Sequence, residues 1–323
     1  MTSKHILLIG SSGHDPSTVV VKSFLNKIRN VEVTVLDTTD LGTSVHFSCA
    51  YANAERCEIT LQEGRSQIIL SNVHAIWNRR WHEPKAIRSL QQENYIQAYA
   101  LENWNSLFYG ASLCSGTVWV NDPSKQSIAA HKLYQLEIAQ EVGFHIPRTM
   151  VTSDPSTATQ FIEEVGEVIG KSLATLFKAP ATKTVPLTRK HRETIELLRY
   201  APVIFQEHVK VDRDIRVIVI GSICYCGEVK TAEGNDPVDW RSDFNNPWRQ
   251  HLLPEAIAQA CIKLTSSLGL RYGAIDLRLT PSGEYVFFEI NPAGQFLFLE
   301  VWTNMPIAAS IADYLVSVEN RTI

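Results

Sequence analysis

Two carboxylates and an amide lie close together in the stretch GAIDLRLTPSGEYVFFEINPAGQF, residues 273–296. Asp276 precedes a Thr-Pro-Ser-Gly turn, and Glu289 and Asn291 follow it. If the two flanks are paired strands, Asp276 lies roughly opposite Glu289. Carboxylate and amide oxygens are the ligands that Mg²⁺ prefers, and bound Mg²⁺ usually takes further ligands from nucleotide phosphates. The stretch therefore predicts a site for a metal ion and a nucleotide.

Alternation along the hairpin predicts which side chains share a face. The expected polar face carries Asp276, Arg278, Glu289 and Asn291, and alternation places Ala274 and Phe287 on the same side. The expected apolar face carries Ile275, Leu277, Leu279, Val286, Phe288 and Ile290. A polar strand face is often only solvated. Apolar runs flank this hairpin on both sides, however, so a hairpin with a buried site is the favoured interpretation.

The composition is that of an ordinary globular protein of two or three domains, with 323 residues, 45% hydrophobic and 20% charged. A formal net charge of −4 argues against nucleic-acid binding through bulk positive charge. The apolar run near the N-terminus is short and is followed at once by glycine and polar residues, which predicts a buried strand rather than a signal peptide. No apolar run is long enough to predict a membrane span, so we expect neither nucleic acid nor membrane as a partner.

The six cysteines form no CxxC pair and have no suitably spaced histidine nearby. Cys224 and Cys226 are two apart in an apolar run, which places both on one face of a strand. This distribution is typical of reduced, packed thiols rather than of disulfides or zinc ligands. We therefore expect a cytoplasmic location.

The N-terminal part of the chain reads as an α/β unit. Residues 5–9 and 32–36 have strand patterns, and residues 16–28 between them have a helical apolar stripe. The turn GSSGHD after the first strand lacks the GxGxxG spacing of a dinucleotide-binding loop, so a plain strand-to-helix turn is favoured.

Two arginines stand between two tryptophans at the end of the strand pattern at residues 75–81. Arg79 and Arg80 could form a lip that binds carboxylates or a peptide. They could equally be surface arginines stacked on Trp77 and Trp81. Both interpretations stay open.

The remaining patterns divide the chain further. Helices are expected at residues 93–109, 128–142 and 254–268, a short strand at 118–121, and strands at 203–209 and 214–221. The segment 148–202 is strand-poor in pattern and rich in Lys, Thr and Ala, with a candidate mobile flap at 179–184. We expect an N-terminal domain over residues 1–120, a central domain over 121–202 and a C-terminal domain over 203–323.

Several strings together resemble the ATP-grasp superfamily in order and spacing, over most of the chain beyond residue 121. They are Lys132, Lys178, FQEHV at 205–209, DIR at 214–216, DWR at 239–241, AID at 274–276 and EINP at 289–292. Within that superfamily, IWNRRW, NDPSKQSIAAHKLYQLEIAQEVGFHIPRT and EINPAGQFLFLE are similar to the peptide maturases of microviridin-type peptides, also called graspetides. The resemblance implies an α/β (α+β) ATP-grasp fold with a Rossmann-like pre-ATP-grasp domain, a central lid domain and a catalytic domain.

The resemblance also implies roles for single residues, with ATP and Mg²⁺ as cofactors. The implied catalytic residues are Arg216, Arg241 and Arg278, and the implied metal ligands are Asp276, Glu289 and Asn291. The implied nucleotide-binding residues are Lys132 and Lys178 for the phosphates, Gln206, Glu207, His208 and Val209 for the adenine, and Asp214 for the ribose. One departure is that the flap contains no glycine, so its phosphate contacts are not assigned.

The implied activity is an ATP-dependent ligation within a ribosomal precursor peptide that has a leader and an acidic core. An Asp or Glu side chain would be activated as an acyl phosphate and attacked by a Ser or Thr hydroxyl or a Lys amine. A homodimer is expected. One alternative is a ligase that joins a free amino acid to a protein tail or a small carboxylate. A non-catalytic module that binds a peptide or nucleotide is the other, although it would not need costly paired carboxylates.

Overall fold

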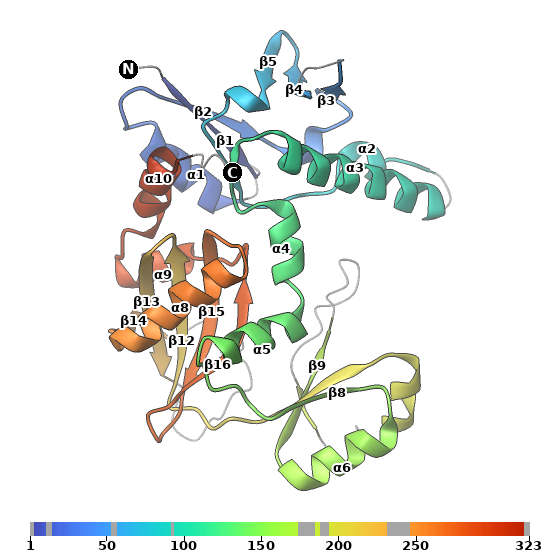
Figure 1. Ribbon diagram of the computed structural model, residues 1–323, viewed down its shortest axis with the longest axis vertical. Helices are drawn as coiled ribbons and strands as arrows, with labels where there is room; N and C mark the ends of the chain where they lie inside the picture. The colour runs from blue at the N-terminus through green and yellow to red at the C-terminus, as the bar shows by residue number, and fades with distance from the viewer. Residues whose placement is uncertain are drawn as a thin grey trace.

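The computed structural model describes residues 3–10, 15–52, 57–91, 94–173, 185–187, 194–230 and 246–319. The predicted site residues Lys178 and Arg241 lie outside this described part, as do residues 11–14 of the glycine turn and the expected flap. Figure 1 shows an N-terminal unit, a central unit and a C-terminal unit, with two short helices between the first and the other two.

A parallel sheet in the order β2-β1-β6-β7 forms the centre of the N-terminal unit and confirms its predicted α/β character. Its strands are β1 (Lys4–Ile9), β2 (Val31–Leu36), β6 (Ala75–Asn78) and β7 (Val118–Val120). The first helix, α1 (Pro16–Leu25), begins after Asp15, whose side chain accepts a hydrogen bond from Ser17 N. It ends earlier than expected, before the turn into β2.

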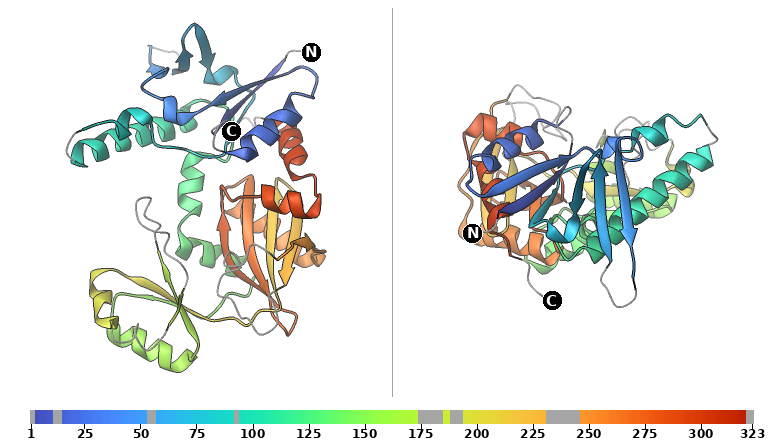
Figure 2. Two further views of the ribbon diagram at one scale, coloured as in Figure 1. Left: turned by 180° about the vertical axis from the view of Figure 1, so that it is seen from behind. Right: turned by 90° about the horizontal axis from the view of Figure 1, so that it is seen from above.

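The N-terminal unit also contains a second sheet and a longer helix than the sequence predicts. A second, antiparallel sheet in the order β3-β4-β5 was not predicted from the sequence. Helix α3 extends beyond its expected range and lies along the outer side of the unit (Figure 2). The elements are η1 (Thr38–Asp40), β3 (Val45–Ala50), β4 (Glu58–Glu63), β5 (Ser66–Ile69), η2 (Leu70–Asn72), α2 (Lys85–Arg88) and α3 (Asn94–Cys114).

The expected helix at residues 128–142 is two helices, α4 (Pro123–Ala129) and α5 (Lys132–Glu141). His131 between them has an extended ψ of 110°. The side chain of Gln135 donates to Ala129 O at 2.7 Å and so satisfies a carbonyl that the break exposes. The break lets α4 pack on α3 while α5 packs on the C-terminal sheet.

The expectation of a strand-poor segment at 148–202 is wrong. Three short strands of this segment join β11 in an antiparallel sheet in the order β10-β9-β11-β8. Strands this short, with one face buried under a single helix, show only a weak alternation of apolar and polar residues. The sequence therefore did not predict them. The elements are β8 (Thr149–Thr152), α6 (Pro155–Val165), β9 (Val168–Ser172), β10 (Val185–Pro186), η3 (Ile195–Tyr200) and β11 (Val203–Glu207). A boundary between residues 202 and 203 would cut β11 from this sheet, so we place it after β11.

A five-stranded antiparallel sheet in the order β14-β13-β12-β15-β16 forms the C-terminal unit. Helices α8 and α5 cover one face, and α9 and α10 lie against the other. The elements are β12 (Arg213–Ile220), β13 (Ile223–Lys230), β14 (Arg249–Gln250), α8 (Glu255–Ser267), β15 (Tyr272–Leu279), β16 (Tyr285–Asn291), α9 (Leu297–Thr303) and α10 (Ile307–Ser317).

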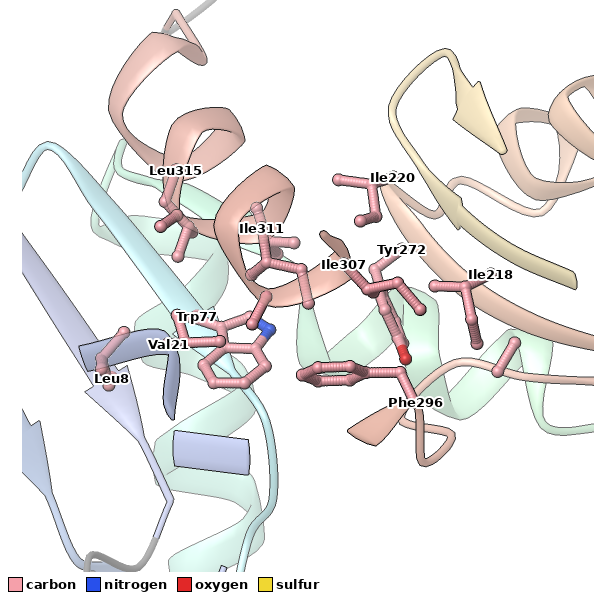
Figure 3. Packing of buried hydrophobic residues seen from close by; sticks show 14 of the residues in the cluster. Leu8, Val21, Trp77, Ile218, Ile220, Tyr272, Phe296, Ile307, Ile311 and Leu315 are labelled. Atoms are coloured by element: carbon pink, nitrogen blue, oxygen red, sulfur yellow. The ribbon is translucent and has the colours of Figure 1, made fainter. Parts of the chain in front are cut away.

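One hydrophobic core joins the N-terminal and C-terminal units. Leu8, Val21 and Trp77 from the first unit pack with Ile311 and Leu315 of α10 in a cluster that continues to the C-terminal sheet (Figure 3). Helix α1 also packs directly on α10. The two units therefore form one hydrophobic body rather than two independent domains. No helix in the described ranges has both the length and the apolar character needed to cross a bilayer.

A bulge in the hairpin corrects the predicted faces. The register shifts between Asp276 and Leu277, so that Asp276 pairs with Glu289 and Leu277 pairs with Phe287. Phe287 is therefore fully buried in the core under α5 and α8. Phe288 instead lies beside Arg278, whose guanidinium carbon is 5.3 Å from the ring centre. Strict alternation predicts the opposite arrangement, with Phe288 in the core and Phe287 on the polar face.

Candidate active site

The carboxylate pair predicted from the sequence forms in the structure. Asp276 on β15 is the cross-strand partner of Glu289 on β16, which confirms the predicted opposition. Arg216 on β12 is the cross-strand partner of Asp276 on its other side, and Nη1 donates to Asp276 Oδ1 at 2.6 Å. Arg216 is 5% exposed and Asp276 is 8% exposed. Three adjacent strands thus place two carboxylates and one guanidinium side by side.

Asn291 lies at the exposed end of β16. Its Oδ1 accepts a hydrogen bond from Ala293 N at 3.0 Å. An amide oxygen has two lone pairs, so this bond leaves one that could face a cation. Asn291 pairs with Ala274, two residues before Asp276, so all three predicted metal ligands lie along one strip of the hairpin.

The donor set fits Mg²⁺ in chemistry. Carboxylate and amide oxygens suit a hard cation that keeps waters and phosphate oxygens in its remaining positions. No group of three or more His, Cys, Asp or Glu side chains in the described ranges is placed to hold a metal by itself. The strip offers only two carboxylates, so a cation there would depend on ligands from a nucleotide.

A second ion pair lies two residues further along the same strands. Arg278 Nε donates to Asp214 Oδ1 at 2.9 Å, and both side chains are less than one tenth exposed. Arg278 Nη1 donates to Val209 O at 2.8 Å. Arg278 therefore ties the chain segment after β11 to the C-terminal sheet. Its hydrogen bonds to Val209 O and Asp214 Oδ1 place Arg278 beside two residues that the resemblance assigns to adenine and ribose.

The face of the central sheet opposite to α6 carries a polar relay, of which the sequence indicated only Gln206. Lys171 Nζ donates to Gln206 Oε1 at 2.7 Å, and Gln206 Nε2 donates to Thr149 Oγ1 at 2.9 Å. Lys171 Nζ also lies 4.9 Å from the ring centre of Phe288. Lys171 thereby connects the central unit to the C-terminal site. The lysine in the short strand VIGKS was the available signal, whereas the resemblance implies Lys178 as the phosphate contact.

The other predicted nucleotide residues lie around this relay. Lys132, the first residue of α5, donates from Nζ to Ser172 O at 3.2 Å, so it approaches the end of β9. Glu207 ends β11, and its Oε2 accepts from Arg148 N at 3.2 Å. His208 N donates to Glu167 O at 2.9 Å. The described members of the predicted set therefore surround the junction of the central and C-terminal units.

We call Asp276, Glu289 and Asn291 the metal strip. Each of the four backbone carbonyls that follow it accepts a hydrogen bond from a side chain. Asn121 Nδ2 donates to Pro292 O at 2.8 Å, Arg79 Nη1 to Ala293 O at 2.6 Å, Tyr272 Oη to Gly294 O at 2.7 Å and Arg216 Nη2 to Gln295 O at 3.2 Å. Burial raises the pKa of Tyr272 to about 12, so its hydroxyl keeps the proton that it donates. We call residues 292–295 the clamped loop.

The backbone of Ile290 in the edge strand β16 is also hydrogen-bonded by a side chain. Gln135 Nε2 donates to Ile290 O at 2.9 Å, and Gln135 Oε1 accepts from Ile290 N at 3.1 Å. The residue between Glu289 and Asn291 is thus fixed through both of its backbone groups. Gln135, Asn121 and Tyr272 were not selected from the sequence, because their role is visible only once distant segments meet, whereas Arg79 and Arg216 were selected for other roles.

This arrangement can bind a polyanion with a metal ion and stabilise negative charge that develops beside it. Lysines, arginines and paired carboxylates converge from the central and C-terminal units, and Lys132, Lys171, Arg216 and Arg278 are held by hydrogen bonds to other residues. Such preorganised charge is suited to phosphoryl transfer from a nucleotide to a carboxylate.

Comparison with known proteins matches both parts of the chain to ATP-grasp families. A family model described as MvdD pre-ATP grasp domain matches residues 5–127, and one described as RimK-like ATP-grasp domain matches residues 129–315. The chain is similar to macrocyclase MdnC bound with precursor peptide MdnA from Microcystis aeruginosa MRC, with 25% identity and a TM-score of 0.87 over 97% of this chain and 100% of that chain.

Two further proteins are similar to this chain, an ATP-grasp ligase solved with ligands and a synthase. The structure of ATP-grasp ligase PsnB complexed with minimal precursor, Mg and ADP has 25% identity and a TM-score of 0.78, covering 98% of each chain. N-acetylaspartylglutamate synthase A of Homo sapiens is 24% identical over 62% of this chain. That match spans about half of the relative's own length, 52%.

Gly294 lies where a side chain would not fit. An added Cβ would be 2.3 Å from Ala274 Cβ and 2.7 Å from Arg216 Nη2. We expect Gly294→Ala to displace the Arg216 guanidinium and to lower the free energy of unfolding by about 1–3 kcal/mol, measured by urea denaturation. Gly110→Ala in α3 is the matched control, because no described atom outside its own helix lies within 4 Å of the new Cβ. Equal stability of the two variants would contradict this packing.

Proposed function

The chain belongs to the RimK-like ATP-grasp family, and we propose on that premise that it is an ATP-dependent peptide macrocyclase. It activates Asp or Glu side chains of a ribosomal precursor peptide as acyl phosphates. A Ser or Thr hydroxyl or a Lys amine of the same peptide then displaces phosphate and closes a ring. The bond type, ester or amide, follows from which nucleophile the precursor supplies.

The observation that carries this proposal is similarity along the full length of a peptide macrocyclase. The match to the precursor-bound macrocyclase MdnC includes the N-terminal unit as well as the ATP-grasp part. The curated synthase match covers 62% of this chain, and the N-terminal unit matches the separate MvdD pre-ATP grasp description. A ligase that acts on a free amino acid is therefore the less supported alternative.

Charge neutralisation and positioning are the tasks of the protein in this reaction, because the substrate carboxylate itself attacks the γ-phosphorus and releases ADP. Mg²⁺ held at Asp276, Glu289 and Asn291 would supply positive charge at the phosphates. Lys132 and Lys171 are placed to hold phosphate oxygens, each already oriented by a hydrogen bond. Lys178 and Arg241 keep their predicted roles as part of the proposal.

Arg216 is the residue best placed to stabilise the acyl phosphate. Its guanidinium is fixed by Asp276 on one side and by Gln295 O on the other, so little reorganisation is needed when charge develops. In the second step the nucleophile loses a proton and phosphate leaves. Each ring therefore removes one water from the peptide overall.

The central unit offers a contact for the part of the precursor that is not modified. An apolar cavity of about 450 Å³ opens on the helical side of its sheet. Its described lining includes Leu187, Leu197, Leu198 and Phe205, and Leu197 is 60% exposed. A leader segment with apolar side chains would bind there and raise the effective concentration of the core at the site. We propose this cavity as the leader contact.

Mass spectrometry of a precursor peptide tests the activity. The precursor encoded beside this chain's gene, incubated with the protein, ATP and Mg²⁺, should lose about 18 Da for each ring, because one water leaves per ligation. A sample without ATP is the control. Efficient addition of free glutamate to an acceptor, together with no dehydrated precursor, would instead favour the amino-acid ligase.

The metal strip generates a separate prediction. Glu289→Gln should lower ATP turnover about 100-fold or more, because a neutral amide cannot offset the charge of a metal and a triphosphate. Asp276→Asn should do the same, and it should also lower stability by leaving Arg216 without its carboxylate partner. Turnover is measured as ADP release.

Glu284→Gln is the matched control for this pair. Glu284 lies in the exposed turn of the same hairpin, so its charge is lost without touching the strip. The Glu284 variant should keep normal turnover. ADP release near the normal rate by folded Glu289→Gln and Asp276→Asn variants would show that the strip does not hold a catalytic metal.

A further inference from the structure

A cavity lined by basic side chains lies on the C-terminal sheet, outside the site described above. Its volume is about 420 Å³. Its lining comes from β12, β13 and the segment that ends in β14, and consists of Arg213, Glu228, Lys230, Asn246, Pro247 and Arg249. Of these described residues three are basic and one is acidic, in a chain whose formal net charge is −4. The cavity is therefore a local excess of positive charge, which favours an anionic ligand.

The strand register places this cavity on the face of the sheet opposite to the metal strip. Glu228 on β13 is the cross-strand partner of both Ile215 and Arg249. Ile215 belongs to the core under α5 and α8. Arg216, the next residue on β12, points to the other face, where it pairs with Asp276. A ligand in the cavity therefore does not occupy the place of the metal or of the reacting carboxylate.

Hydrogen bonds in the lining use its carboxylate and leave two of its cations for a ligand. Glu228 Oε1 accepts from Arg213 Nη1, and Glu228 Oε2 accepts from His251 Nδ1. Lys230 and Arg249 are exposed. Neither of their side chains has a hydrogen-bond or ion-pair partner within the described part of the chain. The charge of Glu228 is thus shared by two other partners and does not neutralise these two cations.

The spacing of the two cations matches an extended acidic peptide. Lys230 and Arg249 are diagonal neighbours on adjacent strands, because Arg249 pairs with Glu228, two residues before Lys230. Diagonal neighbours of this kind are roughly 7 Å apart. In an extended chain, alternate side chains lie on the same side at a repeat of about 6.6 Å. A segment with acidic residues at alternate positions therefore reaches both cations at once.

We propose that this cavity binds an acidic segment of the precursor peptide other than the segment that is being modified. The proposal rests on the proposed function, because that function supplies an acidic peptide as the partner. It names a second contact for that peptide, on a different surface from the leader cavity of the central unit. The alternative is that Lys230 and Arg249 are only solvated surface cations.

The position of the cavity fixes how far the bound segment is from the reacting side chain. β14 lies at one edge of the sheet, and β16, which carries Glu289 and Asn291, lies at the other. Four strand spacings separate the two edges, about 19 Å. The acidic segment is therefore at least about six residues from the side chain that is activated. Its binding keeps the peptide near the site and raises the effective concentration of the core.

Direct binding of a probe peptide tests this cavity without catalysis. The probe is Gly-Glu-Thr-Glu-Thr-Glu amide with an uncharged coumarin label, and its neutral counterpart has Gln in place of every Glu. Fluorescence anisotropy with the full-length protein measures Kd. The double variant Lys230→Gln with Arg249→Gln should bind the probe about tenfold more weakly, because two charge contacts are lost.

Arg65→Gln with Lys263→Gln is the matched control. It removes the same charge from exposed positions outside the cavity and should change the Kd of the probe less than about twofold. Equal weakening by both double variants, or equal binding of the glutamine peptide, would overturn the proposal.

Competition identifies the source of the anion. Inorganic phosphate should displace the probe only where chloride of the same ionic strength displaces it as well, because both then act by screening. Displacement by phosphate at much lower ionic strength would assign the cavity to phosphate and overturn the proposal.

Kinetics with the precursor separate this cavity from the proposed function. The Lys230 and Arg249 double variant should raise KM for the precursor about tenfold and keep kcat and KM for ATP within about twofold of normal, because the cavity acts on binding and not on the chemical step. A precursor KM equal to that of the control variant would overturn the proposal. Specific probe binding by a protein that closes no ring would instead refute the macrocyclase activity and keep the cavity as a site for acidic peptides.

Discussion

Buried charge must be neutralised by a close partner, and the ion pair of Arg216 with Asp276 satisfies this requirement at the centre of the catalytic sheet. The two residues are cross-strand neighbours on β12 and β15, so the sheet register itself creates the pair. The pair of Asp214 with Arg278 repeats the arrangement two residues away. The site thus holds Arg216 and Arg278 through hydrogen bonds to neighbouring residues, and this preorganisation is what stabilisation of a developing charge requires.

A similar requirement explains the contacts of the N-terminal unit with the clamped loop. The clamped loop follows the metal strip, and its carbonyls, that of buried Gly294 among them, accept from donor side chains of both units. Asn121 and Arg79 provide two of them from the N-terminal side, and Tyr272 and Arg216 provide the others. The shared core between α1 and α10 holds the two sides at a fixed distance. The N-terminal unit and the catalytic sheet are therefore coupled through one loop.

Local patterns predicted those parts of the site that lie on one hairpin or one strand. The opposition of Asp276 and Glu289 followed from alternation and a short turn, and it formed as predicted. The exchange of Phe287 and Phe288 was missed because a bulge adds one residue, and nothing local to the string EYVFFEIN marks where. Lys171 was missed because its neighbours Gln206 and Phe288 are distant in sequence. Contacts of this kind arise only from tertiary packing.

Transfer of an oxygen isotope tests the central claim, that a peptide carboxylate is activated as an acyl phosphate. A precursor whose Asp and Glu side chains carry ¹⁸O in both carboxylate oxygens is incubated with the protein, ATP and Mg²⁺. Attack of the carboxylate on the γ-phosphorus and later loss of phosphate should leave one ¹⁸O in each released phosphate and one in each new ester or amide. Ring formation with unlabelled phosphate would contradict the account, because the carboxylate would then not have been phosphorylated.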